Sequence, residues 1–244
     1  MIGNSIFLSA EWRKLALANY AVDKEILLKY LPPFTELDDW QGKYYVSLVG
    51  FMFVNTKLRG YSIPFHGNFE EVNLRFYVKY KENGVYKRGV VFIKEIVPKP
   101  AITFIANSIY KENYQTLAMR HQWVENNGQL EVRYSWKNKD WNNFSITTST
   151  QCEPIEVNSK EEFITEHYWG YTKIGTNLTS EYGVEHPRWE VYPVKSYQIE
   201  VDFERNYGKD FSFLSLSKPH SVMLAEGSPI NVLKGKKIGK PSSI

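Results

Sequence analysis

The residues whose types and spacing could do chemistry are most concentrated in the segment from Phe69 to Val78. With the two-residue period of a β-strand, its polar side chains share one face and its apolar side chains share the other. The polar face carries an acid, an amide, a guanidinium and a phenol, which are Glu71, Asn73, Arg75 and Tyr77. Successive members of such a row stand about 6.5–7 Å apart. The row is either a hydrated sheet face or the lining of a polar pocket.

A buried row would need a partner for Arg75, because an unpaired buried charge is costly. Glu71 is near enough on the same face to hold the guanidinium, and a bound carboxylate could take the remaining donors in a bidentate arrangement. Asn73 and Tyr77 would then supply orienting hydrogen bonds. The row therefore predicts a site for a small polar or anionic organic molecule, with aromatic side chains as its apolar walls.

Two further side chains are candidates for the same pocket. His186, in the turn that precedes Trp189, could act as an acid or base, and the alternative is a structural histidine. Tyr171 lies on a helix predicted over residues 160–171 and could close the mouth of a pocket, the alternative being helix–sheet packing. The five histidines show no metal-binding spacing, and the chain has no phosphate loop or dinucleotide fingerprint. We therefore expect no metal site and no cofactor.

The composition limits the class of protein. An aromatic content of 16% favours sheet structure. The net charge is +3, and four lysines in the last eleven residues account for more than all of it, so nucleic-acid binding is not indicated. The single cysteine, Cys152, fits a reducing compartment, and no apolar run is long enough for a membrane span. We expect a soluble cytoplasmic protein without a membrane partner, for which a homo-oligomer is compatible with the sequence.

The elements that must position these residues follow from turn and cap signals. Asn83-Gly84 predicts a hairpin that joins the polar row to a return strand over residues 89–97, and Asn127-Gly128 predicts a second hairpin. Residues 101–108 suit a helix or a strand, and we favour a helix. Ser159 and Glu162 form a capping box that opens the helix over residues 160–171. Strands are expected over residues 144–153, 189–194, 197–203 and 211–216. We expect one domain over residues 1–233 and a basic flexible tail over residues 234–244.

Several motifs resemble those of the YqjF-like proteins, a bacterial family without an assigned activity in the acetoacetate-decarboxylase-like superfamily. The matching segments span residues 12 to 189 in order: Trp12-x-x-Leu15, Tyr20-x-Val-Asp23, Leu31-Pro32, Val46-Ser-Leu-Val49, Phe69-x-Glu-x-Asn-x-Arg-x-Tyr-Val78, Gly89-Val-Val-Phe92, Tyr114, Ala118-Met119, Phe163-Ile-Thr-Glu166, Tyr168-Trp169, Tyr171-Thr172 and His186-Pro-Arg-Trp189. The resemblance implies an α+β, β-rich fold. Its mostly antiparallel curved sheet would close into a barrel or cone with a few outer helices and a cavity inside.

The resemblance also suggests an enzyme. Acetoacetate decarboxylase uses a lysine made nucleophilic at neutral pH by a neighbouring cation. That lysine follows a proline and has a glutamate a few residues upstream, as Lys99 follows Pro98 and Glu95 here. The adjacent second lysine of that enzyme is Pro100 in this chain, and Lys94 is the only close replacement. A Schiff-base decarboxylase or lyase acting on a keto acid through Lys99 is the alternative function, and a surface lysine in a turn is the structural alternative.

Overall fold

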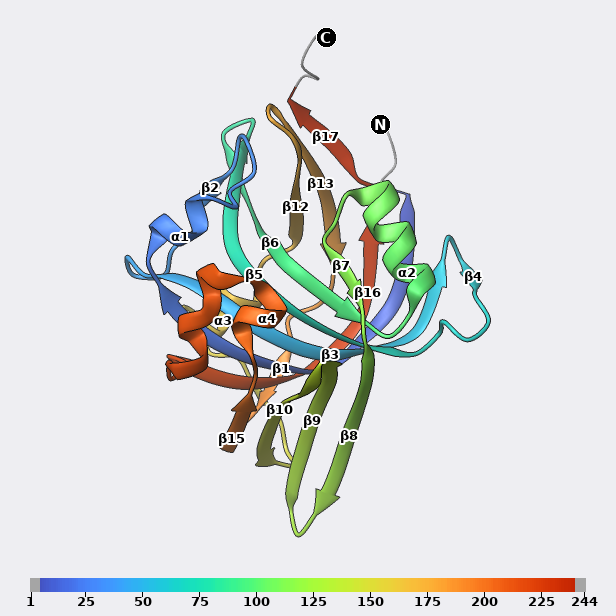
Figure 1. Ribbon diagram of the computed structural model, residues 1–244, viewed down its shortest axis with the longest axis vertical. Coiled ribbons are helices and arrows are strands. Elements are labelled where there is room, and N and C mark those ends of the chain that lie inside the picture. Colours follow the sequence, from blue (N-terminus) through green and yellow to red (C-terminus); the bar gives the residue numbers. More distant parts are fainter. Residues whose placement is uncertain (1–4, 240–244) are drawn as a thin grey trace.

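The computed structural model of the chain describes residues 5–239 (Figure 1). Within them, thirteen strands form one strongly curved sheet. Its strands are β1 (Ile6–Val22), β2 (Glu36–Leu37), β3 (Tyr44–Leu58), β4 (Tyr61–Ser62), β5 (Phe69–Glu82), β6 (Val85–Val97), β7 (Tyr114–Thr116), β11 (Glu153–Pro154), β12 (Trp169–Gly175), β13 (Leu178–Glu185), β14 (Glu190–Tyr192), β16 (Ser221–Leu233) and β17 (Lys236–Gly239). The polar row lies on β5, between β3 and β6.

The strands of the main sheet form a partly closed ring. The order runs β16-β1-β3-β5-β6-β12-β13, and β13 pairs again with β16. Two of these junctions are short: β6 and β12 pair in parallel at Gly89 and Val90, and β13 meets β16 only at Val184 and Glu185. Strand β7 also runs parallel to β6, and the other pairings are antiparallel. The predicted β-rich, mostly antiparallel curved sheet is confirmed, and its ring closes only in part.

A smaller sheet covers the outer face of the main sheet. It contains β8 (Ala118–Asn126), β9 (Gln129–Asn138), β10 (Asp140–Ser149) and β15 (Val194–Glu200), and it lies below the main sheet in Figure 1. Trp136 and Tyr134 of β9 are fully buried in one apolar core with Leu48 and Leu74 of the main sheet. The layers meet closely at Gly50, where a Cβ atom would stand 2.8 Å from the Tyr134 ring. Any larger residue at this position would force the sheets apart.

The helices are short. They are α1 (Lys24–Leu28), α2 (Pro100–Ile105), the π-helix η1 (Ala106–Tyr110), α3 (Lys160–Thr165), α4 (Phe203–Tyr207) and the 3-10 helix η2 (Lys209–Leu216). The helix favoured for residues 101–108 is confirmed. Ser159 caps α3 as predicted, since its hydroxyl accepts a hydrogen bond from the Glu162 N–H.

Two predicted elements are wrong. Helix α3 ends at Thr165, so Tyr171 lies on strand β12 instead of a helix. The aromatic run that suggested a longer helix is the start of a half-buried strand, whose period is two. Residues 211–216 form part of the 3-10 helix η2 instead of a strand. Phe211 and Leu214, on one side of η2, are buried in the same apolar core as Phe203 and Tyr207 of α4. A short apolar run does not by itself distinguish these conformations.

The C-terminal segment differs from the expected flexible tail. Lys236–Gly239 forms β17, which pairs with residues 178–181 of β13, and Ile238 is buried. Lys236 also forms an ion pair with Glu82. Residues 240–244 lie outside the described part of the chain. No helix among the described residues is long and apolar enough to span a bilayer.

Candidate functional site

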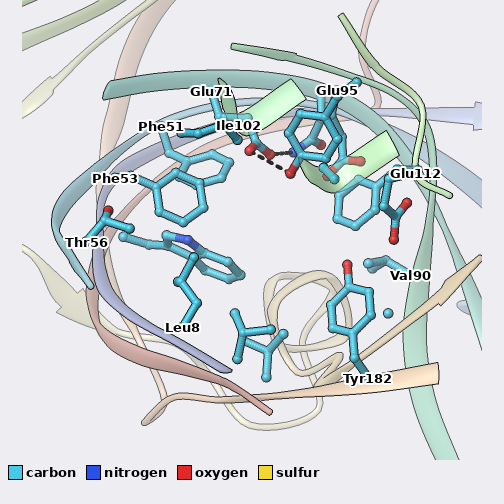
Figure 2. Close-up of a pocket in the computed structure, with 18 of the residues that line it drawn as sticks. Leu8, Phe51, Phe53, Thr56, Glu71, Val90, Glu95, Ile102, Glu112 and Tyr182 are labelled. Atoms are coloured by element: carbon cyan, nitrogen blue, oxygen red, sulfur yellow. Dashed lines mark hydrogen bonds between the residues drawn. The ribbon is translucent and has the colours of Figure 1, made fainter. Parts of the chain in front are cut away.

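A cavity of about 280 Å³ lies against the inner face of the main sheet (Figure 2). Aromatic rings form much of its wall: Trp12, Phe51, Phe53, Phe69, Phe92, Trp169 and Trp189. Its rim includes Ile63 and His66, from the long loop between β3 and β5, and Ile102 of α2. Figure 2 shows the rings of Phe51 and Phe53 on one side of the space and the carboxyl group of Glu112 across from them. A mostly apolar cavity with a few polar groups is the usual form of a small-molecule site.

Strand β5 supplies the polar row of this cavity. The alternation predicted for β5 is observed: Glu71, Asn73 and Arg75 line the cavity, while Val72 and Leu74 lie in the core under the second sheet. Glu71 and Asn73 are only 3% and 1% exposed, and Arg75 is 8% exposed. The row is therefore buried, and the hydrated sheet face that the sequence left open is excluded.

The fourth member of the row, Tyr77, does not line the cavity. Its hydroxyl lies 2.6 Å from the Ser47 Oγ, and its ring packs 4.7 Å from the His167 ring. Ser47 in turn donates to the Asn19 Oδ1. Tyr77 therefore supports the wall beside Arg75, and its polar atom is already occupied by a protein partner.

Three carboxyl groups, which we call the acid cluster, line one part of the cavity: Glu71, Glu95 and Glu112. Asn73 donates to Glu71 through Nδ2 at 2.9 Å, and the Tyr114 hydroxyl donates to the other oxygen of Glu71 at 3.2 Å. Glu112 accepts a hydrogen bond of 2.6 Å from Thr172. The cluster therefore draws its members from β5, β6 and the loop before β7.

The three carboxyls titrate abnormally because they are removed from water and lie near one another. Burial raises the pKa of Glu71 to about 7, and hydrogen bonds from Asn73 and Tyr114 offset only part of this effect. Burial likewise raises the pKa of Glu112 to about 7. Burial, and then the charges of Glu112 and Glu71, raise the pKa of Glu95 well above its usual range. The acid cluster therefore holds protons at neutral pH.

A β-bulge decides that Glu95 belongs to this cluster. In the pairing of β5 with β6, Leu74 stands opposite Lys94 but Arg75 stands opposite Phe92, so the register shifts at Ile93. Such an extra residue reverses the side-chain alternation beyond it. Phe92 and Glu95 consequently both line the cavity, and Lys94 does not.

The Arg75 guanidinium is buried without a protein counter-ion. Among the described residues its Nε has no hydrogen-bond partner and its side chain forms no ion pair. It makes a cation–π contact of 5.8 Å with the Tyr77 ring, and its charge acts on Glu71 from beyond ion-pair distance. The expected ion pair with Glu71 is absent from residues 5–239, because the two Glu71 oxygens accept from Asn73 and Tyr114 instead. Arg75 therefore presents a positive charge to the cavity.

A separate ionic network lies behind Arg75. Asp38 accepts hydrogen bonds from Arg88 at 2.7 Å and from His167 at 3.2 Å. Burial would raise the pKa of Asp38, but these two hydrogen bonds outweigh it and hold the pKa at about 2. Burial lowers the pKa of His167 to about 4, so its ring is neutral at pH 7 and donates through Nε2. This network fixes the His167 ring, which lines the cavity.

His186 and Tyr171 have different positions. His186 lines the cavity, with its ring between Trp189 at 4.3 Å and Tyr168 at 4.6 Å. Burial lowers the pKa of His186, and its Nδ1 lies 2.9 Å from the Pro187 carbonyl. Tyr171 is buried away from the cavity, and its hydroxyl donates to the Lys87 carbonyl. The structure thus brings His186 to Glu71, Asn73 and Arg75, and leaves Tyr171 out.

Lys99 is not among the cavity-lining residues. It precedes Pro100 at the start of α2 and is partly exposed. Its charge lies near the Glu70 carboxylate. Lys94, the alternative cation, is partly buried on the opposite face of β6, where burial lowers its pKa. The amine and the second cation of the predicted Schiff-base site therefore do not meet in the cavity.

Several cavity residues were missed by the sequence interpretation. Glu112 follows the helical segment in a polar stretch that is typical of solvated loops, and Glu95 was considered only as a residue upstream of Lys99. The signal for Tyr114 was its place in the family motifs. No group of three or more His, Cys, Asp or Glu residues in the described part of the chain is arranged to hold a metal ion.

Solved structures with a similar fold include acetoacetate decarboxylase and an acetoacetate decarboxylase-like enzyme. Acetoacetate decarboxylase from Legionella pneumophila aligns with a TM-score of 0.65 at 13% identity, over 96% of this chain and 87% of that chain. An acetoacetate decarboxylase-like enzyme from Sphingomonas wittichii RW1 aligns with a TM-score of 0.65 at 8% identity, over 96% and 94%. The enduracididine biosynthesis enzyme MppR, complexed with pyruvate, aligns with a TM-score of 0.62 at 12% identity, over 97% and 91%. At these identities the likeness shows the fold.

The sequence also defines the family. Residues 9–229 match DUF2071, described as an uncharacterized conserved protein, and the chain belongs to this family. The uncharacterized protein YqjF of Bacillus subtilis (strain 168) is 26% identical over 226 residues, which are 90% of this chain and 84% of that protein. The resemblance inferred from the motifs is confirmed.

Proposed function

We propose that this protein binds a small organic carboxylate in the cavity, with Arg75 holding the carboxylate group. The observation that carries the proposal is the buried Arg75 guanidinium without a protein counter-ion. Leaving such a charge unpaired costs several kcal/mol, and a carboxylate offers two oxygens in the geometry of the guanidinium fork. Pyruvate, present in one structure with this fold, is a molecule of this class.

The remaining cavity residues have supporting roles in this proposal. Asn73 and His186 would orient the ligand by hydrogen bonds, and the rings of Trp12, Phe51 and Phe53 would exclude water from its apolar part. Tyr77, whose hydroxyl contacts Ser47, would stabilise the wall instead of contacting the ligand. The Schiff-base alternative through Lys99 gains no support from its position outside the cavity.

The test is a ligand titration with an Arg75→Met variant, which keeps the volume of the side chain and removes its charge. We expect short aliphatic and aromatic carboxylates to raise the unfolding temperature of the parent protein. The variant should bind them at least about tenfold more weakly by calorimetry, as expected for loss of a charge-assisted bidentate contact. Arg205→Met is the matched control, because Arg205 is exposed and its guanidinium forms an ion pair with the exposed Asp202. Equal affinities in parent and Arg75→Met would overturn the proposal.

A cytoplasmic location and a homo-oligomeric assembly remain further proposals. The location rests on the presence of one cysteine, Cys152, in a chain of 244 residues. Sedimentation of the purified chain would measure the assembly state.

A further inference from the structure

The cavity is lined by a guanidinium and three carboxyl groups that form no ion pair with one another among the described residues. Arg75 faces it without an ion-pair partner, and its charge is only the smallest of the effects on the pKa of Glu71. Among residues 5–239, neither a lysine nor an arginine forms an ion pair with Glu71, Glu95 or Glu112. In the part of the chain that the structure describes, Asn73, Tyr114 and Thr172 are the protein donors that contact the acid cluster.

The acid cluster also has unsatisfied acceptors. The Oε2 of Glu95 and the Oδ1 of Asn73 have no hydrogen-bond partner among the described residues, although Glu95 and Asn73 are only 2% and 1% exposed. Buried polar atoms normally find partners, and each atom left without one costs about 1–3 kcal/mol. The Asn73 Oδ1 can only accept a hydrogen bond, and the Glu95 Oε2 accepts one when the carboxyl is ionised, which is the form that a cation beside it favours. A ligand that satisfies this part of the cavity must therefore bring donors.

The register of the sheet separates this part of the cavity from the guanidinium. Asn73 pairs with Glu95, and Arg75 pairs with Phe92 one side-chain repeat further along β5. The repeat is about 6.5–7 Å. A donor group that reaches Glu95 and a carboxylate that reaches Arg75 therefore bind at successive side-chain positions along β5, and the rings of Phe51, Phe53 and Phe92 line the same cavity.

We infer that the ligand carries a primary ammonium group, bound by the acid cluster, at the end opposite its carboxylate. This inference rests on the carboxylate site proposed above. The ligand class is an ω-amino acid with an aliphatic or aromatic middle, because an α-amino acid has both charged groups on one carbon and does not span the distance. An ammonium group supplies three donors and the positive charge that the three carboxyls lack.

Binding of an ammonium group has a measurable effect on the protons of the cavity. The groups that face the acid cluster include Arg75, Tyr114 and Tyr182, and burial raises the pKa of Tyr114 well above its usual range, so its hydroxyl is uncharged at neutral pH. The pKa of Glu71 and that of Glu112 are about 7, so both are partly protonated there. A cation beside them favours their ionised forms. The ligand should therefore displace protons into solution when it binds.

The experiment compares matched pairs of ligands by calorimetry at pH 7: aminohexanoate with hexanoate, and aminomethylbenzoate with methylbenzoate. We expect the amine to improve affinity about tenfold or more, as for charge-assisted hydrogen bonds in a site shielded from water. Titrations in buffers of different ionisation enthalpy should show proton release for the amines and not for the carboxylates. In Glu95→Gln the amine advantage, measured as the affinity of each amine divided by that of its matched carboxylate in the same variant, should fall to about threefold or less.

The outcomes separate this inference from the proposal on which it rests. If hexanoate and methylbenzoate bind through Arg75 but the amine brings no gain, the ammonium site is wrong and the carboxylate site stands. If α-amino acids such as glycine bind as well as the ω-amino acids, the inferred separation between the carboxylate site and the ammonium site is wrong. If no ligand of either kind binds at millimolar concentration, both proposals fail. A Glu112→Gln variant provides a second measurement should Glu95→Gln not fold.

Discussion

The protein buries carboxyl groups in two places, and the pKa of these groups shifts in opposite directions there. Asp38 lies between Arg88 and His167, and its pKa is held at about 2. In the acid cluster, burial dominates, and the pKa of Glu71 rises to about 7. Both carboxyls are almost inaccessible to solvent, at 7% and 3% exposed. The difference is the presence of a donor cation, and it separates a carboxyl that stabilises the fold from carboxyls available to a ligand.

Asp38 and the acid cluster make the free energy of unfolding depend on pH in opposite directions. The folded-state pKa of Asp38 is depressed, so its contribution is present above its unfolded value and is lost as the pH falls through about 2. The folded-state pKa values of Glu71 and Glu112 are raised, so their stabilising contribution is present below the unfolded values and is lost as the pH rises through about 7. Stability should therefore decline from mildly acidic to neutral pH.

The largest effect should come from breaking the paired carboxyl. We expect Asp38→Asn to lower the free energy of unfolding by about 2–4 kcal/mol at pH 7, because Arg88 loses its ionised partner and one carboxylate oxygen is replaced by an amide NH₂ that cannot accept. The range extends down to about 2 kcal/mol because the Arg88 side chain is 36% exposed, so water can partly replace the lost ion pair. Denaturant unfolding measures the change. Asp140→Asn, at an exposed position, is the control, and an equal small loss in both variants would contradict the comparison.

A smaller effect of the opposite sign is expected in the acid cluster. Glu95→Gln should raise the free energy of unfolding by about 1–3 kcal/mol above pH 7, because it removes a group whose ionisation opposes folding. Near pH 4 the parent and the variant should be equally stable, since Glu95 is then protonated in both states. Urea titrations from pH 4 to 9 test this. A variant that is less stable than the parent at pH 8 would show that Glu95 is paired, and Glu36→Gln, on the exposed face of β2, is the control.

The smallest effect is expected at Lys99. Lys99→Ala should change the free energy of unfolding by no more than about 0.5 kcal/mol, as for a partly exposed residue outside a buried network. The ligand-induced rise in unfolding temperature should persist. Treatment with borohydride and short keto acids should leave the mass of Lys99 unchanged. A stable adduct on Lys99 would instead support the decarboxylase or lyase alternative, and would require the Lys99 side chain to reach the cavity, which it does not line.

The sequence predicted much of the fold and part of the site because those features are local. The hairpin at Asn83-Gly84 forms as expected, with both turn residues at positive φ. The cap of α3 is also local, because the Ser159 hydroxyl accepts a hydrogen bond from the N–H of Glu162, three residues further along the chain. The placement of Glu71, Asn73 and Arg75 on one buried face followed from strand periodicity and the family resemblance. The roles assigned to these side chains stay predictions.

The tertiary structure decided which groups meet. The amino-acid order alone determined a β-rich chain with an acid, an amide and a guanidinium in one row, because alternation along a strand depends only on the backbone. It could not place Glu95 in the cavity and Lys94 outside it, since a one-residue bulge at Ile93 reverses the alternation of β6. Nor could it bring Glu112 to Glu71, 41 positions apart in the printed sequence. Such contacts depend on the curvature and partial closure of the whole sheet, which no single segment encodes.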